Sequence, residues 1–143
     1  MFKKETEYAL RALVYIQRCN GEQYRPGIAG IASATGTPQP FIAQILHKLV
    51  RQNVVSSSKG RGGGFFFDPS KPDLSLKNLI NLIEGDKIFT GCGFGLKQCD
   101  EENPCPLHEH YSAIRNEINS LVTKETIQSL AGRTKNNSIT ENV

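Results

Sequence analysis

The chain has 143 residues, 38% of them hydrophobic, a size that suits one domain or one small domain with an extension. No apolar run approaches the roughly 18–20 residues of a membrane span, and the N-terminus lacks the apolar segment of a secretion signal. The sequence therefore predicts a cytoplasmic protein with no membrane partner. Residues 1–70 hold nine Lys/Arg and four Asp/Glu (+5), whereas residues 71–143 hold eight and ten (−2). A basic front half suggests a polyanion partner, although ordinary surface variation explains it equally well.

The first predicted helix covers residues 5–19, where apolar residues recur at helical spacing. Thr6 is expected to cap its start, and the Asn20-Gly21 pair to end it. Cys19 continues the apolar stripe of this helix. We therefore expect it to be a buried small hydrophobe rather than a metal ligand.

Two further helices are predicted after Ile28, with a turn at Gly36 between them. Thr37 is expected to cap the second of these, with Pro38 at its first position, where the missing N–H costs nothing. Its buried stripe is predicted to be Phe41, Ile45, Leu46 and Leu49, and its outer face Gln39, Gln44, His47, Lys48 and Arg51. Two helices joined by a tight turn, the second polar and basic outside, are typical of a helix-turn-helix, although any helical hairpin looks similar.

A β-hairpin is predicted next, because Val54–Ser58 and Phe65–Phe67 are β-prone and residues 59–64 between them are rich in glycine. A phosphate-binding loop is disfavoured, since no Lys-Ser/Thr pair follows the glycines and the loop leads into a strand. The turn carries Lys59 and Arg61. A basic hairpin directly after a helix-turn-helix predicts a wing that approaches DNA.

Three of the four cysteines fall in residues 91–108, which we call the cysteine loop: Cys92, Cys99 and Cys105. A short helix over residues 75–85 precedes it, capped by Ser75 and ended by Gly85, with Leu76, Leu79, Ile80 and Ile83 on one face. Thiolates gathered in a polar loop usually hold a soft metal or an iron–sulfur cluster. In a cytosolic chain such cysteines more often bind metal or react than form disulfides.

The last predicted helix has apolar residues at steps of four, three, four and three, the spacing of a coiled-coil seam: Leu107, Tyr111, Ile114, Ile118 and Leu121. This stripe is expected to pack on a second copy of the chain, the alternative being its own domain. A homodimer also suits a helix-turn-helix protein, which usually reads a palindromic site with two copies.

Together these elements predict a mostly α fold with a small β-hairpin: a winged helix-turn-helix with a long C-terminal dimerisation helix. The expected parts are a DNA-binding domain over residues 1–85, the cysteine loop and dimerisation helix over residues 86–131, and a disordered tail over residues 132–143.

Several short motifs, in this order and at this spacing, resemble those of the Rrf-two family of bacterial winged-helix regulators, the IscR/NsrR type. The similarity runs from about residue 5 to residue 130. The motifs are Tyr8-Ala9-Leu10, the IAxxxG pattern of Ile31 to Gly36, Phe41 with Ile45, Leu46 and Leu49, the wing Lys59 to Phe65, the Glu84-Gly85 pair, and the three cysteines with Pro104 to Leu107.

The resemblance implies a dimer in which the three cysteines ligate a 2Fe–2S or 4Fe–4S cluster, and cluster status sets the affinity for double-stranded operator DNA. The fourth ligand varies in the family. Here it is either His108, three residues after the last cysteine, or an acidic residue from the partner, Glu7 of the partner subunit. Asn53 stands where many members have glycine, and asparagine tolerates the left-handed conformation that this turn needs.

The family's recognition helix maps to residues 38–52 and its wing to residues 59–64. We expect Gln39 and Gln44 to read base edges, and Thr37 and Lys48 to contact phosphates. Lys59 and Arg61 are expected to contact DNA from the wing.

Three other readings stay open. Three cysteines with His108 also suit a structural zinc ion. A thiol-redox regulator would need the cysteines alone, and a small iron–sulfur electron carrier would leave the basic hairpin without a use. No Ser-His-Asp set, carboxylate pair or nucleotide loop is evident, so an enzyme is not expected.

Overall fold

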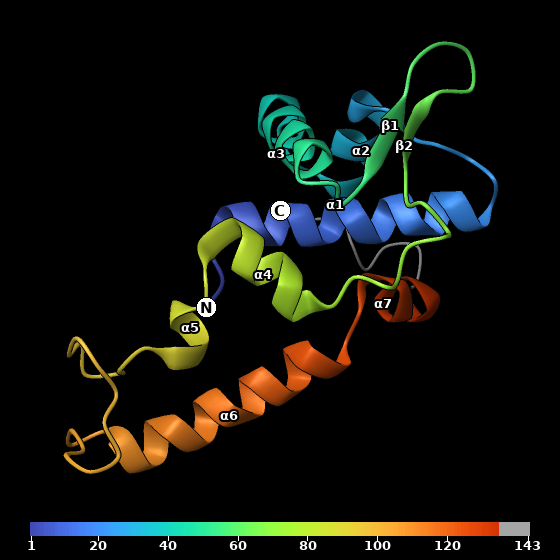
Figure 1. Cartoon of the computed structure of the whole chain (residues 1–143). Helices are drawn as coiled ribbons and strands as arrows, with labels where there is room; N and C mark the ends of the chain where they lie inside the picture. The colour runs from blue at the N-terminus through green and yellow to red at the C-terminus, as the bar shows by residue number, and fades with distance from the viewer. Residues whose placement is uncertain (135–143) are drawn as a thin grey trace. The chain divides into compact units, whose positions relative to one another are not determined.

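The computed structural model describes residues 1–134, which form two compact units (Figure 1). Of the described residues, the first unit comprises Met1–Leu74 together with the chain from Thr126 to Thr134, and the second comprises Ser75–Glu125. This division differs from the predicted boundary at residue 85. None of the described helices is long and apolar enough to cross a membrane.

The first unit is built on α1 (Lys4–Gly21), which packs against α2 (Ile28–Thr35), α3 (Gln39–Arg51) and α7 (Ile127–Arg133). Leu13 and Ile16 of α1 are fully buried, as are Ile31 of α2 and Ile127 of α7. Burial of each such side chain contributes about 1.5–3 kcal/mol, so this interior accounts for much of the unit's stability. Cys19 is buried in the same interior, which confirms the prediction for it.

Two predicted helix caps are wrong. α1 begins at Lys4 with Lys3 at its N-cap position, and Thr6 lies inside the first turn with 1% of its surface exposed. α3 has Pro38 at its N-cap position. Thr37 is buried, and its hydroxyl lies 2.7 Å from that of Thr35, so the side chain is turned into the helix-turn-helix instead of capping α3. The predicted end of α2 at Gly36 is confirmed, with a left-handed φ of 67°.

The buried stripe of α3 agrees with the prediction at Ile45, Leu46 and Leu49 and differs from it at its first member. Phe41 is 54% exposed, and Ile42 is fully buried in its place. The stripe is therefore Ile42, Ile45, Leu46 and Leu49. This set has the i, i+3, i+4, i+7 spacing of an amphipathic helix, which the set beginning at Phe41 has less completely.

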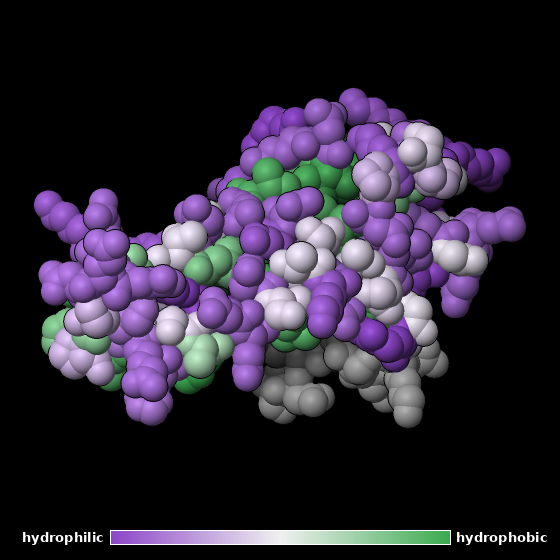
Figure 2. Space-filling view, turned by 60° about the horizontal axis from the view of Figure 1, so that its bottom comes forward, coloured by the Kyte–Doolittle hydropathy of each residue, from purple (hydrophilic) through white to green (hydrophobic). Residues whose placement is uncertain are grey.

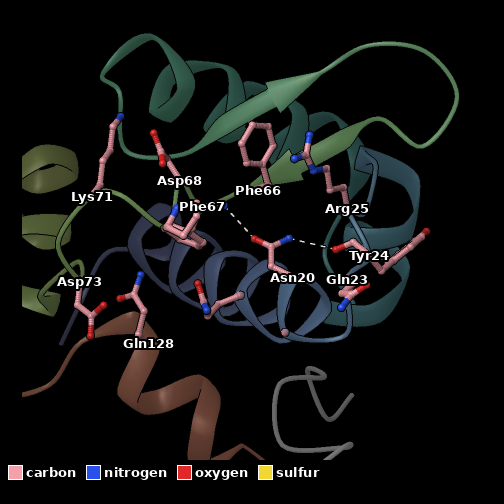
Figure 3. A pocket seen from close by; sticks show the side chains of 13 residues that line it. Asn20, Gln23, Tyr24, Arg25, Phe66, Phe67, Asp68, Lys71, Asp73 and Gln128 are labelled. Carbon is pink, nitrogen blue, oxygen red and sulfur yellow. Dashed lines mark hydrogen bonds between the residues drawn. The ribbon is translucent and has the colours of Figure 1, made fainter.

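The wing is an antiparallel hairpin of β1 (Ser56–Ser58) and β2 (Gly64–Phe66), with Ser57 opposite Phe65. Its outer edge is tied to α1 by Asn20 (Figure 3). The Asn20 amide donates to the carbonyl of Phe65 over 3.3 Å and accepts from the N–H of Phe67 over 2.8 Å. Asn53, before β1, has a φ of 60°, the left-handed conformation expected for it.

The second unit contains α4 (Leu76–Glu84), α5 (Lys87–Thr90) and α6 (His108–Lys124), and α6 packs against both other helices. The predicted caps of α4 are confirmed: Ser75 Oγ accepts from the N–H of Asn78 over 3.1 Å, and Gly85 ends the helix with a φ of 82°. The cysteine loop connects α5 to α6.

The predicted seam of α6 is largely uncovered. Leu107, Ile114 and Leu121 are 45%, 55% and 57% exposed, and Tyr111 and Ile118 are half-buried. Figure 2 shows some apolar surface among hydrophilic residues at the end where the cysteine loop and the first turns of α6 lie. Phe94 and Leu96 of the loop are exposed. The seam is therefore available for a partner.

The two segments that join the units are hydrogen-bonded to each other. Leu74 accepts from the N–H of Ile127 and donates to the Gln128 side chain, both over 2.9 Å. Within the second unit, the N–H of Leu76 donates to the carbonyl of Glu125 over 3.0 Å. α7 continues to Arg133, one residue beyond the predicted start of the tail. Residues 135–143, on which the rest of that prediction falls, lie outside the described part of the chain.

Candidate DNA interface and metal centre

The outer face of α3 presents the polar side chains that were predicted for a recognition helix. Gln39 and Gln44 are exposed, and Lys48 is half-buried with its ammonium 3.5 Å from the carboxylate of Glu5. Thr37 lies in the interior, so the structure does not place its hydroxyl on this face.

Phe41 is a surface feature that the sequence analysis missed. Its ring lies 6.3 Å from that of Tyr8, between centroids, and both side chains line a shallow pocket between α1 and α3. Lys4, Lys48 and Arg51 line the same pocket. The pocket therefore places an exposed aromatic ring beside three cations and the carboxylate of Glu5.

The tip of the wing is shaped by glycines. Gly60 and Gly62 have φ values of 87° and 73°, which favour glycine, and the N–H of Gly63 donates to the carbonyl of Gly60 over 3.0 Å. Lys59 and Arg61 are exposed at this tip, so both cations point away from the unit's interior.

Arg25 braces the wing from outside the hairpin, and no sequence motif indicated it. Its guanidinium donates to Ser58 Oγ over 3.1 Å and stacks 3.7 Å above the centre of the Phe66 ring. The two contacts join both strands through one side chain, since Ser58 is in β1 and Phe66 in β2.

The cysteine loop brings its predicted ligands together as two pairs. The Sγ atoms of Cys92 and Cys105 lie 3.6 Å apart, and Cys99 Sγ lies 3.3 Å from His108 Nδ1. All four side chains are half-buried. Among residues 1–134, no three His, Cys, Asp or Glu side chains lie close enough to hold a single metal ion. Glu7 is in the first unit, on α1, with its carboxylate 3.6 Å from the Lys4 ammonium.

The chain turns tightly around the Cys92 sulfur. The N–H of Gly95, whose φ is 86°, donates to the Cys92 carbonyl over 3.1 Å. Hydrogen bonds from the backbone N–H of Leu96, then from those of Phe94 and Gly95 and from the Cys105 side chain, lower the pKa of the Cys92 thiol below its ordinary value. Amide donors directed at sulfur stabilise a thiolate, the form that binds metal and reacts with electrophiles.

A helix-turn-helix followed by a glycine-rich basic hairpin defines a winged-helix DNA-binding protein. The chain belongs to the Rrf2 family, described as iron-dependent transcriptional regulators, whose model matches residues 2–133. A putative HTH-type transcriptional regulator of Aquifex aeolicus is 27% identical over 132 residues, covering 91% of this chain and 90% of that protein.

Two solved structures share the fold. CymR, the global cysteine regulator of B. subtilis, has a TM-score of 0.73 at 20% identity and covers 94% of this chain and 98% of its own. T. potens IscR has a TM-score of 0.70 at 18% identity, and the match covers 94% of this chain and 88% of the IscR chain. Family and relatives make the protein a DNA-binding transcriptional regulator and not an enzyme.

Proposed function

We propose that the protein is a homodimeric regulator whose affinity for operator DNA is set by an iron–sulfur cluster held by Cys92, Cys99, Cys105 and His108. The observation that carries this proposal is the arrangement of the four side chains in two close pairs. The family's description as iron-dependent adds to it.

The pair distances fit two ligands on one metal. Two thiolates on a tetrahedral metal, with metal–sulfur bonds of about 2.3 Å, lie about 3.8 Å apart, and a thiolate and an imidazole about 3.6 Å apart. The observed separations are 3.6 Å and 3.3 Å. Each pair therefore suits one iron of a 2Fe–2S cluster, whereas a 4Fe–4S cluster takes one protein ligand on each iron. When bound, the cluster supplies a group that changes redox state or is lost on reaction with oxygen or nitric oxide.

His108 is favoured over Glu7 as the fourth ligand. Its Nδ1 already lies beside Cys99, and it is the first residue of α6, so the helix fixes its backbone. Glu7 would have to come from the partner subunit, and its carboxylate is already ion-paired with Lys4. A ligand that already lies beside the other ligand of the same iron loses less conformational entropy when the metal binds.

A thiol-redox regulator without a cluster is the second candidate. The 3.6 Å separation of Cys92 and Cys105, together with the lowered pKa of Cys92, favours attack of one thiol on an oxidised form of the other. A structural zinc ion is less well suited, because it needs all four ligands around one point. An electron carrier would give the winged helix no role.

Two copies of the chain would join through the exposed seam of α6 and present two recognition helices to a palindromic operator. Gln39 and Gln44 would read base edges, Phe41 would add an apolar contact, and Lys48 with the wing cations Lys59 and Arg61 would neutralise phosphates.

The test is anaerobic reconstitution with iron and sulfide, followed by metal and sulfide analysis and an absorption spectrum. We expect about two irons and two sulfides for each subunit, as the 2Fe–2S assignment requires. His108→Ala should lose the cluster, whereas Glu7→Ala and the neighbouring His110→Ala should keep it. Iron-free, colourless protein that forms a Cys92–Cys105 disulfide on oxidation would favour the second candidate.

The same samples should then be compared in operator binding. Cluster-loaded and metal-free protein are expected to differ by about 5–150-fold in Kd, the usual range of allosteric coupling. Equal affinities over a range of salt concentrations would contradict control by the cluster.

A further inference from the structure

We propose that Tyr111 and Arg115, one turn apart on α6, are positioning residues that clamp the backbone on both sides of Cys92 against this helix. The proposal rests on the proposed function in one respect, that Cys92 is a cluster ligand. The contacts themselves lie within the second unit and involve only its described residues.

Arg115 holds the residue before Cys92. Its Nη1 donates to the carbonyl of Gly91 over 2.9 Å, and the N–H of Gly91 donates to the carbonyl of Lys87 at the end of α5 over 2.7 Å. Gly91 is thus fixed on both sides of its Cα. A Cβ at this position would lie 2.6 Å from the Lys87 carbonyl oxygen, so only glycine fits there.

The guanidinium of Arg115 is not fully hydrogen-bonded by groups of its own helix. Arg115 Nε is buried and has no hydrogen-bond partner among the described residues. A buried guanidinium donor without a partner costs about 1–3 kcal/mol. Arg115 Nη1, in contrast, has an acceptor, which is the carbonyl of Gly91.

Tyr111 holds the residue after Cys92. A Cβ on Gly93 would lie 2.5–2.8 Å from three carbons of the Tyr111 ring, which means that the ring lies directly against the bare backbone of Gly93. Real Cβ atoms are not found so close to another heavy atom. The absence of a side chain at Gly93 is therefore what allows the ring to cover this peptide.

The clamp fixes one sulfur pair to α6. Cys92 lies between the two clamped glycines, and its partner Cys105 comes three residues before α6 begins and accepts from the N–H of His108 over 3.0 Å. The exposed seam of the same helix carries the proposed dimer contact. Tyr111 and Arg115 thus connect the position of the Cys92 backbone to the helix on which the dimer would be built.

Hydrogen exchange of the metal-free protein tests the clamp without any cluster. The variants are Arg115→Gln and Tyr111→Ala, with matched controls Glu117→Gln, an exposed position of α6, and Tyr111→Phe, which keeps the ring. Amides of residues 93–96 should exchange at least about fivefold faster in the two variants, the effect expected when one ordinary hydrogen bond is lost. Exchange within α1 serves as the reference for an intact fold. Unchanged loop exchange in both variants would overturn the proposal.

A pair of glycine variants gives an independent check, should Arg115→Gln fail to fold. Gly93→Ala should accelerate loop exchange in the wild-type background, because the new methyl group displaces the ring. In the Tyr111→Ala background the same substitution should add little, since the space is empty. Residues in contact show such non-additivity, whereas additive effects would contradict direct contact between the ring and Gly93.

Cluster release separates this proposal from the proposed function. In reconstituted protein, Arg115→Gln and Tyr111→Ala should lose iron to a chelator at least about fivefold faster than the wild type, as expected for loss of one supporting contact. Wild-type protein that takes up no cluster would contradict the proposed function, and the exchange data would still decide on the clamp. A normal cluster with unchanged exchange and release would remove the clamp alone.

Discussion

Cys92 and Cys19 show how strongly the surroundings set the chemistry of one type of side chain. Around Cys92 the backbone N–H groups of Leu96, Phe94 and Gly95 lower the thiol pKa. Burial in α1 raises the pKa of Cys19, and a hydrogen bond from Tyr15 offsets only part of this. The surroundings of Cys92 favour its reactive thiolate form, whereas those of Cys19 favour the neutral thiol in the interior.

The two cysteines should therefore react with iodoacetamide at very different rates near pH 7. The lowered pKa gives Cys92 a larger thiolate fraction at neutral pH, whereas the raised pKa and burial of Cys19 leave it as the neutral, shielded thiol. Site-resolved mass spectrometry of reduced, metal-free protein should find Cys92 modified well before Cys19. In 8 M urea, used as the control, the difference should disappear; similar native rates would show that the loop turn does not form.

Single residues also mark the limit of sequence reasoning at this scale. Spacing alone was enough to name the cysteines and to predict that Cys19 is buried. The buried stripe of α3 was predicted correctly at Ile45, Leu46 and Leu49. Its first member was taken to be Phe41 instead of Ile42, although the i, i+3, i+4, i+7 spacing favours Ile42. The pairing of Cys92 with Cys105 was not predictable, since it depends on the path of a loop with no regular structure.

Among the elements, the wing should act through charge at its tip. Arg61→Ala should lower operator affinity and reduce the slope of log K against log[salt] by about 0.9, the value for one neutralised phosphate. Arg61→Lys keeps the charge and should keep the slope. Binding measured at four or more salt concentrations gives both quantities, and a slope that does not change would place Arg61 away from the phosphates.

The long helix α6 should carry the dimer contact. Ile114→Glu places a charge on the exposed seam, where an unpaired buried charge opposes association. We expect the dimer dissociation constant to rise at least about tenfold, equivalent to about 1.4 kcal/mol. Asn116→Glu, on a different face of the helix, is the matched control. Sedimentation at several concentrations gives the measurement, and equal dissociation constants would mean that another surface joins the subunits.

The predicted elements were most accurate where periodicity is long or caps are specific. The hairpin, α2, α4 and the long helix were all expected, and Ser75 and Gly85 were named as the caps of α4. α5 and α7 were missed because four and seven residues are too few to show a helical period. α7 depends on its docking to α1 through Ile127, a contact that no local pattern reveals.

For the whole molecule, the sequence suggested parts that follow one another, but the structure has the second unit inserted into the first. The chain leaves the first unit after Leu74 and returns at Thr126. The hydrogen bonds of Leu74 with the Ile127 N–H and the Gln128 side chain close this unit behind the insertion. Such pairing joins residues more than fifty positions apart, which is why composition and spacing did not indicate it.

The return of the chain has a consequence for proteolysis. The cysteine loop is exposed, and a protease that cleaves it divides the chain between Cys92 and Cys105. The C-terminal fragment then contains α7, whose Ile127 is fully buried, docked against α1 of the N-terminal fragment. Limited digestion should therefore give two bands on a denaturing gel but a single species in gel filtration, and about 6 M urea should separate them, since denaturant weakens buried apolar contacts. Spontaneous separation in buffer would contradict this docking. A nicked protein would then be a complemented pair of fragments, with Cys92 on the N-terminal fragment and Cys105 and His108 on the C-terminal one.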